Sequence, residues 1–137
     1  MKVSVVIPAA GQGKRMKTEK NKQFLKLKDK EIVAHTIDKF ESETVVNDII
    51  VVARKEEIDY CQEKIVNNYD FKKVSQVIAG GATRQDSVYN GLQAVDADSD
   101  YVLVHDGARP FITSELINKV VNRVKKYNAT AVGVPVK

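Results

Sequence analysis

The sequence has a single cysteine, three prolines, no tryptophan and no long hydrophobic run. One cysteine, Cys61, cannot form an internal disulfide, which is typical of a protein from a reducing compartment such as the cytoplasm. No stretch approaches the ~18 apolar residues that a membrane-spanning helix needs. The apolar residues 3–10 are too few and too strand-like for a signal peptide. With 137 residues, we expect one cytoplasmic globular domain.

The chain also carries little net charge, since its formal net charge is only +4. The positive charges are nevertheless concentrated: residues 14–30 hold eight lysines or arginines and two acids. Such a field suits a phosphate group. The stretch has Phe24 as its one aromatic residue and no recognised nucleic-acid motif, so we expect no nucleic-acid partner. Most of these cations are expected to be solvated, with Arg15 and Lys22 as exceptions.

Residues 3–16 read VSVVIPAAGQGKRM, a short β-branched run followed by a loop with two glycines and two cations. Gly11 and Gly13 carry no Cβ, so the backbone can close on a triphosphate with its N–H groups facing the ligand. The P-loop spacing is absent, and the third glycine of the dinucleotide fingerprint would fall at Met16. The loop is therefore either an ordinary strand-to-helix turn or a nucleotide site of another kind.

Strand and helix periodicities alternate along the chain, without an internal repeat or a linker. Strands are expected over Val3–Pro8, Asp48–Ala53, Val74–Ala79, Tyr101–His105 and Thr130–Val136. Helices with one buried face are expected from the sets Val33, Ile37, Phe40; Ile58, Cys61, Ile65; Val88, Leu92, Val95; and Ile117, Val120, Val124. Thr83 and Thr113 are expected helix starts. The alternation, with no hairpin signal, predicts an α/β fold with a mostly parallel sheet.

Polar or glycine-rich turns follow three of the expected strands. They read AAGQG at 9–13, GGATR at 80–84 and HDGARP at 105–110. In open α/β sheets the ligand binds beyond the carboxyl ends of the strands, so these turns should meet at one edge. Their convergence favours a nucleotide site over three unrelated turns.

Several residues in these turns have plausible roles. Gly80 and Gly81 leave room for a planar base, whose edge Ser87 can hydrogen-bond; the alternative is a tight turn with a surface serine. Asp106 is placed to hold Mg²⁺ together with phosphate oxygens, or is simply a turn residue. Arg109 is expected to pair with Asp106 and fix its rotamer.

The two histidines and the cysteine are expected to have no catalytic role. His105 lies beside the expected site, but such a residue is more often packed or hydrogen-bonded. His35 lies on an expected helix. Cys61 has helical neighbours that suggest packing. We therefore expect all three side chains to be structural.

Four ordered motifs together resemble the 2-C-methyl-D-erythritol 4-phosphate cytidylyltransferase family. They are AAGxGxRM at 9–16, KQFL at 22–25, GGxxRxxS at 80–87 and HDGARPF at 105–111, and they span almost the whole chain. The resemblance implies a Rossmann-like, three-layer α/β/α fold, usually homodimeric. It also implies transfer of CMP from CTP to methylerythritol phosphate, with Mg²⁺ or another divalent cation and release of pyrophosphate, in the non-mevalonate route to isoprenoid precursors.

The resemblance also implies roles for individual positions. Arg15 and Lys22 match the family's catalytic arginine and lysine, which stabilise the five-coordinate phosphorus. The matching substrate-binding positions are Ala9, Ala10, Gly11, Gly13, Gly81, Ala82, Ser87, Asp106 and Gly107. Asp106 would face the metal and the ribose.

The sequence departs from the family pattern at two places. Asn21 stands where the family usually has proline, which implies a less rigid loop. The chain ends at Lys137, where the family continues with Asp-Thr and more. We therefore expect residues 1–137 to be a single nucleotidyltransferase domain, truncated at its C-terminus, without the dimerising arm or the basic residues that hold the acceptor phosphate.

Two other functions remain open from the sequence. A cytidylyltransferase for ribitol 5-phosphate or another polyol phosphate would use the same CTP machinery, although Ala108 favours methylerythritol phosphate. A non-catalytic CTP-binding domain would bind CTP without releasing pyrophosphate. A nucleotide-sugar synthase shares the glycine loop but lacks the Asp106 motif in this form.

Overall fold

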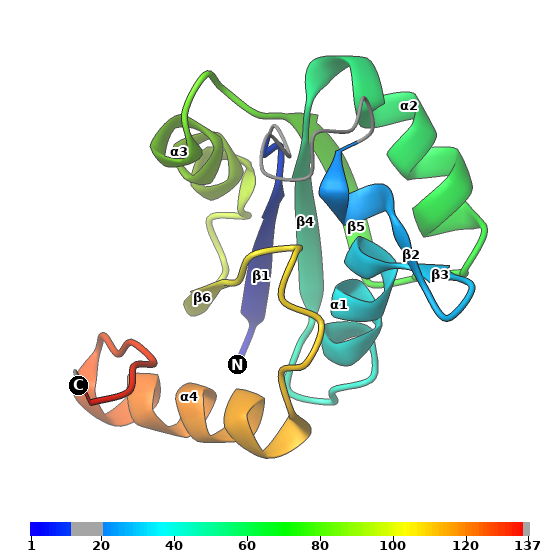
Figure 1. Ribbon diagram of the computed structural model, residues 1–137. Coiled ribbons are helices and arrows are strands. Elements are labelled where there is room, and N and C mark those ends of the chain that lie inside the picture. The colour runs from blue at the N-terminus through cyan, green and yellow to red at the C-terminus, as the bar shows by residue number, and fades with distance from the viewer. Residues whose placement is uncertain (12–20, 136–137) are drawn as a thin grey trace.

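The computed structural model describes residues 1–11 and 21–135 of the chain. At its centre lies a four-stranded sheet in the order β5-β4-β1-β6, in which each neighbouring pair is parallel (Figure 1). The strands are β1 (Val3–Ala9), β4 (Asp48–Ala53), β5 (Val74–Ala79) and β6 (Tyr101–Val104). The predicted α/β fold with a parallel sheet is confirmed.

Helices lie on both faces of this sheet (Figure 1). One face packs against α1 (Ile32–Glu41) and against α2 (Ile58–Tyr60), which continues as the π-helix η4 (Cys61–Asn67). The other face packs against α3 (Arg84–Ala94). A further helix, α4 (Ser114–Tyr127), adds Ile117 to the core of the first face. The arrangement is the expected three-layer sandwich.

The central strands β1 and β4 are buried along their whole length. Val5 and Ile7 of β1 belong to the main core with α1. Val6 lies on the opposite face, against α3. Strands covered on both faces read as continuous apolar runs rather than as alternating ones. That pattern explains why the bounds predicted for these two strands lie so close to the observed ones.

The buried face of α3 differs from the predicted one. Hydrophobic spacing favoured Val88, Leu92 and Val95, but the buried residues are Ser87 and Gly91. Leu92 is 43% exposed. A Cβ at Gly91 would overlap the Val6 side chain, so the helix approaches the sheet through its smallest residues. Hydrophobic periodicity does not detect such a contact.

Both predicted helix starts are confirmed. The Thr83 hydroxyl accepts a hydrogen bond from the Asp86 backbone N–H at 3.1 Å and begins α3. The Thr113 hydroxyl does the same for Leu116 at 3.2 Å and begins α4. Each side chain satisfies one of the backbone donors left free at a helix start.

The absence of a hairpin was a wrong prediction. Strands β2 (Lys26–Leu27) and β3 (Lys30–Glu31) pair antiparallel. Their turn has positive φ at both central residues, Lys28 at 55° and Asp29 at 68°. Turns of this kind usually carry Asn-Gly or Asp-Gly. The sequence therefore carries no hairpin signal here, because the turn is Lys-Asp and each strand has only two residues. The His35 ring nitrogen lies 2.7 Å from the Leu27 carbonyl oxygen, which confirms a structural role for that histidine.

The fifth expected strand, Thr130–Val136, is absent from the described residues. Residues 130–135 pair with no other strand, and Val132 and Val134 are 62% and 86% exposed. Residue 136 lies outside the described residues. A parallel strand is stable when layers cover both of its faces, and these side chains have no such cover. The apolar, β-branched composition of this segment therefore predicted a strand that the described residues do not contain.

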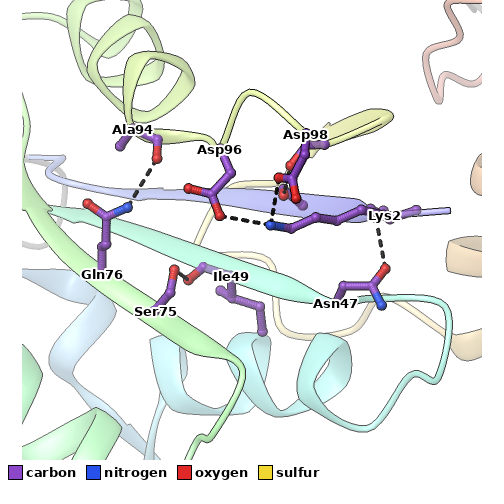
Figure 2. A network of polar contacts seen from close by, with 11 residues as sticks. Lys2, Asn47, Ile49, Ser75, Gln76, Ala94, Asp96 and Asp98 are labelled. Carbon is purple, nitrogen blue, oxygen red and sulfur yellow. Dashed lines mark hydrogen bonds and ion pairs between the residues drawn. The ribbon is translucent and has the colours of Figure 1, made fainter.

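An ion-pair network joins the start of β1 to the connection between α3 and β6 (Figure 2). The Lys2 ammonium lies 2.8 Å from an Asp96 oxygen and 3.0 Å from an Asp98 oxygen, and the two carboxylates raise the pKa of Lys2. Nearby, the Asn47 side chain accepts a hydrogen bond from the Val3 N–H at 2.9 Å. The network lies at the amino end of β1, opposite the end where the predicted turns meet.

Cys61 is fully buried in the core, as predicted. Burial raises the pKa of its thiol to about 12, so the thiol stays protonated at neutral pH. Because the thiolate is the reactive form, we expect a disulfide reagent to label native Cys61 at least ~10²-fold more slowly than the thiol in urea. Labelling followed by absorbance measures both rates. Equal rates would contradict this burial.

None of the helices in residues 1–11 and 21–135 is both long and apolar enough to cross a membrane.

Candidate functional site

A cavity of about 520 Å³ lies at the carboxyl ends of the sheet strands. In the part of the chain that the structure describes, its wall is formed by parts of five segments, at residues 8–11, 22–23, 54–56, 80–87 and 106–108. Three of these segments are the turns that the sequence predicted to meet, and the structure confirms that they do. The segment 54–56 follows β4 and was not predicted.

The structure places most predicted site residues at this cavity. Those on its wall are Ala10, Gly11, Lys22, Gly81, Ala82, Ser87 and Asp106. Ala9 and Gly107 are buried beside the wall rather than on it. The Gly107 N–H donates to the Pro8 carbonyl and its own carbonyl accepts from Thr36, so this residue joins β1, α1 and the 106–108 turn. Gly13 and Arg15 lie outside the described residues.

The turn after β5 packs closely against the start of α3. The Gly81 N–H donates to the Ser87 hydroxyl oxygen at 3.2 Å, and Ser87 is only 3% exposed. A Cβ at Gly80 would lie 2.5 Å from that oxygen and 2.7 Å from the Ala10 Cβ. Only glycine fits so close an approach. Since the Ser87 oxygen already accepts a bond, its hydroxyl proton remains to be donated.

Two arginines contact Asp106. Arg84 places Nε at 3.1 Å and Nη2 at 2.8 Å from one carboxylate oxygen. Arg109 places Nε 3.6 Å from the other, which confirms the predicted pairing. The Arg84 contact was missed because Arg84 begins α3, after the edge strand β5, whereas Asp106 follows β6 at the opposite edge. Together the arginines contact both oxygens of the carboxylate.

His105 has the structural role that was expected. Its Nε2 lies 2.9 Å from the Arg109 carbonyl oxygen, and its ring packs 5.2 Å from the Phe40 ring, centroid to centroid. These contacts turn the imidazole into the fold and fix the turn that carries Asp106.

Among the described residues, the cavity wall carries two acids, Glu56 and Asp106, against four cations: Lys22, Arg54, Lys55 and Arg84. This excess of positive charge suits phosphate groups. In the described residues no group of three or more His, Cys, Asp or Glu could hold a metal ion. Mg²⁺ commonly binds one or two carboxylates and completes its shell with substrate phosphates and water. Asp106 alone therefore fits a cation carried mainly by a bound nucleotide.

Asn21 is firmly held, although a less rigid loop was expected from the missing proline. Its side chain is fully buried and donates to the Ala9 carbonyl at 3.0 Å. Its side-chain oxygen accepts from the Gln23 N–H at 3.1 Å and begins the short 3₁₀-helix η2 (Lys22–Phe24). At this residue, hydrogen bonds replace the restriction that a proline ring would impose, and they position Lys22.

The comparisons with known proteins agree with this geometry. The family model described as 2-C-methyl-D-erythritol 4-phosphate cytidylyltransferase matches residues 3–137. A curated protein of that name from Clostridioides difficile (strain 630) is 49% identical over 133 residues, which are 97% of this chain and 56% of the relative. One from Alkaliphilus metalliredigens (strain QYMF) is 47% identical over 136 residues, or 99% and 56% of the two chains.

Solved structures show the same similarity. The crystal structure of 4-diphosphocytidyl-2C-methyl-D-erythritol synthase from Anaerococcus prevotii DSM 20548 superposes with a TM-score of 0.77 at 33% identity. The match covers 91% of this chain and 51% of that one. The chain thus spans about half the length of the proteins that it matches.

Proposed function

Since the chain belongs to the 2-C-methyl-D-erythritol 4-phosphate cytidylyltransferase family, we propose that it forms the CTP-binding part of an enzyme that transfers CMP from CTP to 2-C-methyl-D-erythritol 4-phosphate. The observation that carries this proposal is the positively charged cavity in which the glycine turns, Lys22, Ser87 and Asp106 meet. The remaining length of the relatives is where we place the acceptor-phosphate contacts and the dimer interface. We also assign the enzyme to the cytoplasm.

In the proposed reaction, an oxygen of the acceptor phosphate attacks the α-phosphorus of CTP. The new P–O bond forms as the bond to the bridging oxygen of the pyrophosphate breaks, and the pyrophosphate leaves with that electron pair. Negative charge gathers on the oxygens of the five-coordinate phosphorus. Fixed positive charge lowers this barrier most, and Lys22 supplies it from the cavity wall. We assign the same task to Arg15 on the family resemblance.

The base is proposed to lie against the turn at Gly80 and Gly81, which lines the cavity. Backbone groups at Ala10 and Ala82 border this space, and the Ser87 hydroxyl is available to donate to the base edge. A buried hydroxyl left without a partner is costly, so the pocket discriminates against bases that cannot accept its bond.

Asp106 is proposed to hold a divalent cation together with the nucleotide phosphates. A bound cation supplies additional neutralisation of the phosphate charge. Arg84 and Arg109 keep the carboxylate in one orientation, at 2.8 and 3.6 Å. Asp106 would hold the cation with its carboxylate, which also contacts the two arginines.

Nucleotide selectivity tests the proposal. We expect the protein from the complete reading frame, given methylerythritol phosphate and Mg²⁺, to release pyrophosphate from CTP with a kcat/KM at least ~10²-fold above that for UTP or ATP. A coupled pyrophosphate assay measures all three. Equal use of the three nucleotides would contradict the assigned base site.

Asp106→Asn tests the metal assignment. The amide keeps the shape of the side chain but removes its charge, so we expect the gain in CTP affinity on adding Mg²⁺ to fall about 10-fold or more. Calorimetric titrations with and without Mg²⁺ measure this gain. Asp59→Asn, an exposed site on α2, is the matched control and should leave the gain unchanged. The same Mg²⁺ dependence in Asp106→Asn and wild type would place the metal elsewhere.

A further inference from the structure

We propose that Arg54 and Glu57 are positioning residues that tie together Gly11 and Asn21, and thereby hold Gly11 and Lys22 in place for phosphate transfer. The inference rests on the proposed function. We call the pair the β4 clip, because Arg54 directly follows β4 and Glu57 ends the 3₁₀-helix η3 (Lys55–Glu57).

The β4 clip makes three contacts. Arg54 Nη2 donates to the Gly11 carbonyl oxygen at 2.6 Å. Glu57 Oε1 accepts from Asn21 Nδ2 at 3.3 Å and lies 3.7 Å from Arg54 Nε. Gly11 and Asn21 are the described residues on either side of residues 12–20, so one ion pair holds both of them.

Burial makes these contacts more significant than those of a surface ion pair. The Arg54 and Glu57 side chains are 20% and 17% exposed. Arg54 Nε is buried and makes no hydrogen bond. This is unusual, because burying a polar group of a charged side chain without a hydrogen bond costs free energy. Burial also raises the pKa of Glu57, against the opposing effects of Asn21 and Arg54. A buried polar group that is incompletely satisfied calls for an explanation, and a functional requirement is one such explanation.

At Gly11 the clip acts on the charge of the cavity wall. Gly11 lines the cavity, and a free carbonyl oxygen there would repel phosphate oxygens. The Arg54 guanidinium donates a hydrogen bond to this oxygen and offsets its partial negative charge. Only a planar fork reaches Gly11 with one nitrogen and faces Glu57 with another.

At Asn21 the clip acts on Lys22. The second side-chain hydrogen of Asn21 goes to Glu57, while the first goes to Ala9. The same side chain begins η2, so the Lys22 backbone follows its orientation. A misplacement of about 1 Å in a group that stabilises a transition state costs up to 10²-fold. Loss of the clip should therefore affect kcat more than CTP binding.

Steady-state kinetics on the protein from the complete reading frame tests the clip. We expect Arg54→Met and Glu57→Gln each to lower kcat about 10-fold, while KM for CTP rises less than about 3-fold. The double variant should be no slower than the slower single variant, because the two residues act as one unit. Lys64→Met, which removes a positive charge from the exposed surface of η4, is the control.

Arg54→Lys separates positioning from charge and guards against misfolding of the methionine variant. A lysine restores the charge but cannot hold Gly11 and face Glu57 together, so kcat should stay within about 3-fold of that of Arg54→Met. Recovery of the wild-type kcat would overturn the clip. So would a raised KM with unchanged kcat, or additive losses in the double variant. If neither the wild type nor Lys64→Met released pyrophosphate, this result would instead refute the proposed function itself.

Discussion

Lys22→Ala is expected to lower kcat for pyrophosphate release by about 10²-fold or more in the protein from the complete reading frame. Lys22 is the cation that η2 presents to the cavity wall, and in the proposed reaction it faces the charge that grows in the transition state. Alanine removes this charge without filling the space. We therefore expect kcat to change far more than KM for CTP, and a coupled pyrophosphate assay measures both.

A control separates this effect from loss of general charge. Lys26→Ala removes a cation from β2, which is exposed and only a few residues away, and should keep kcat within about 2-fold of wild type. Arg15→Ala is expected to match Lys22→Ala, on the family resemblance. Near-normal rates in both Lys22→Ala and Arg15→Ala would refute their catalytic assignment.

Phe24→Ala is expected to destabilise the fold by about 3–5 kcal/mol, the usual cost of a large cavity in a core. The Phe24 side chain is 2% exposed and packs edge-on against Tyr60, with ring centroids 5.1 Å apart. It anchors η2 to α2, so its loss also loosens the segment that carries Lys22. Urea unfolding of the 137-residue chain, followed by circular dichroism, measures the change.

Phe111→Ala is the matched control for that measurement. Phe111 is 81% exposed in this chain, so its removal should change the free energy of unfolding by no more than about 0.5 kcal/mol. Equal effects of the two substitutions would show that Phe24 does not join η2 to the core.

Features that depend on local sequence were predictable. The bounds of β4 and β5 match the structure, and the apolar residues 49–53 and 77–79 end at Arg54 and Gly80. Thr83 and Thr113 began helices because a threonine hydroxyl caps the backbone that follows it. The meeting of the glycine turns followed from strand direction alone.

Features that depend on tertiary packing were not predictable in the same way. The buried face of α3 is set by Gly91, which has no hydrophobicity to detect. Arg84 reaches Asp106 across the width of the sheet, and strand order decides this contact. Arg54 follows β4 without a glycine beside it, so nothing in the local pattern marked it. In each case a partner distant in sequence determines the role.

The most direct test of the proposed activity is Mg²⁺-dependent pyrophosphate release from CTP by the protein from the complete reading frame. Methylerythritol phosphate and ribitol 5-phosphate are offered separately, beside a reaction without acceptor. We predict release with methylerythritol phosphate and none above background in the other two reactions. Release with ribitol 5-phosphate alone would support the proposed use of CTP but contradict the proposed acceptor. No pyrophosphate release with either acceptor would contradict the proposed transfer.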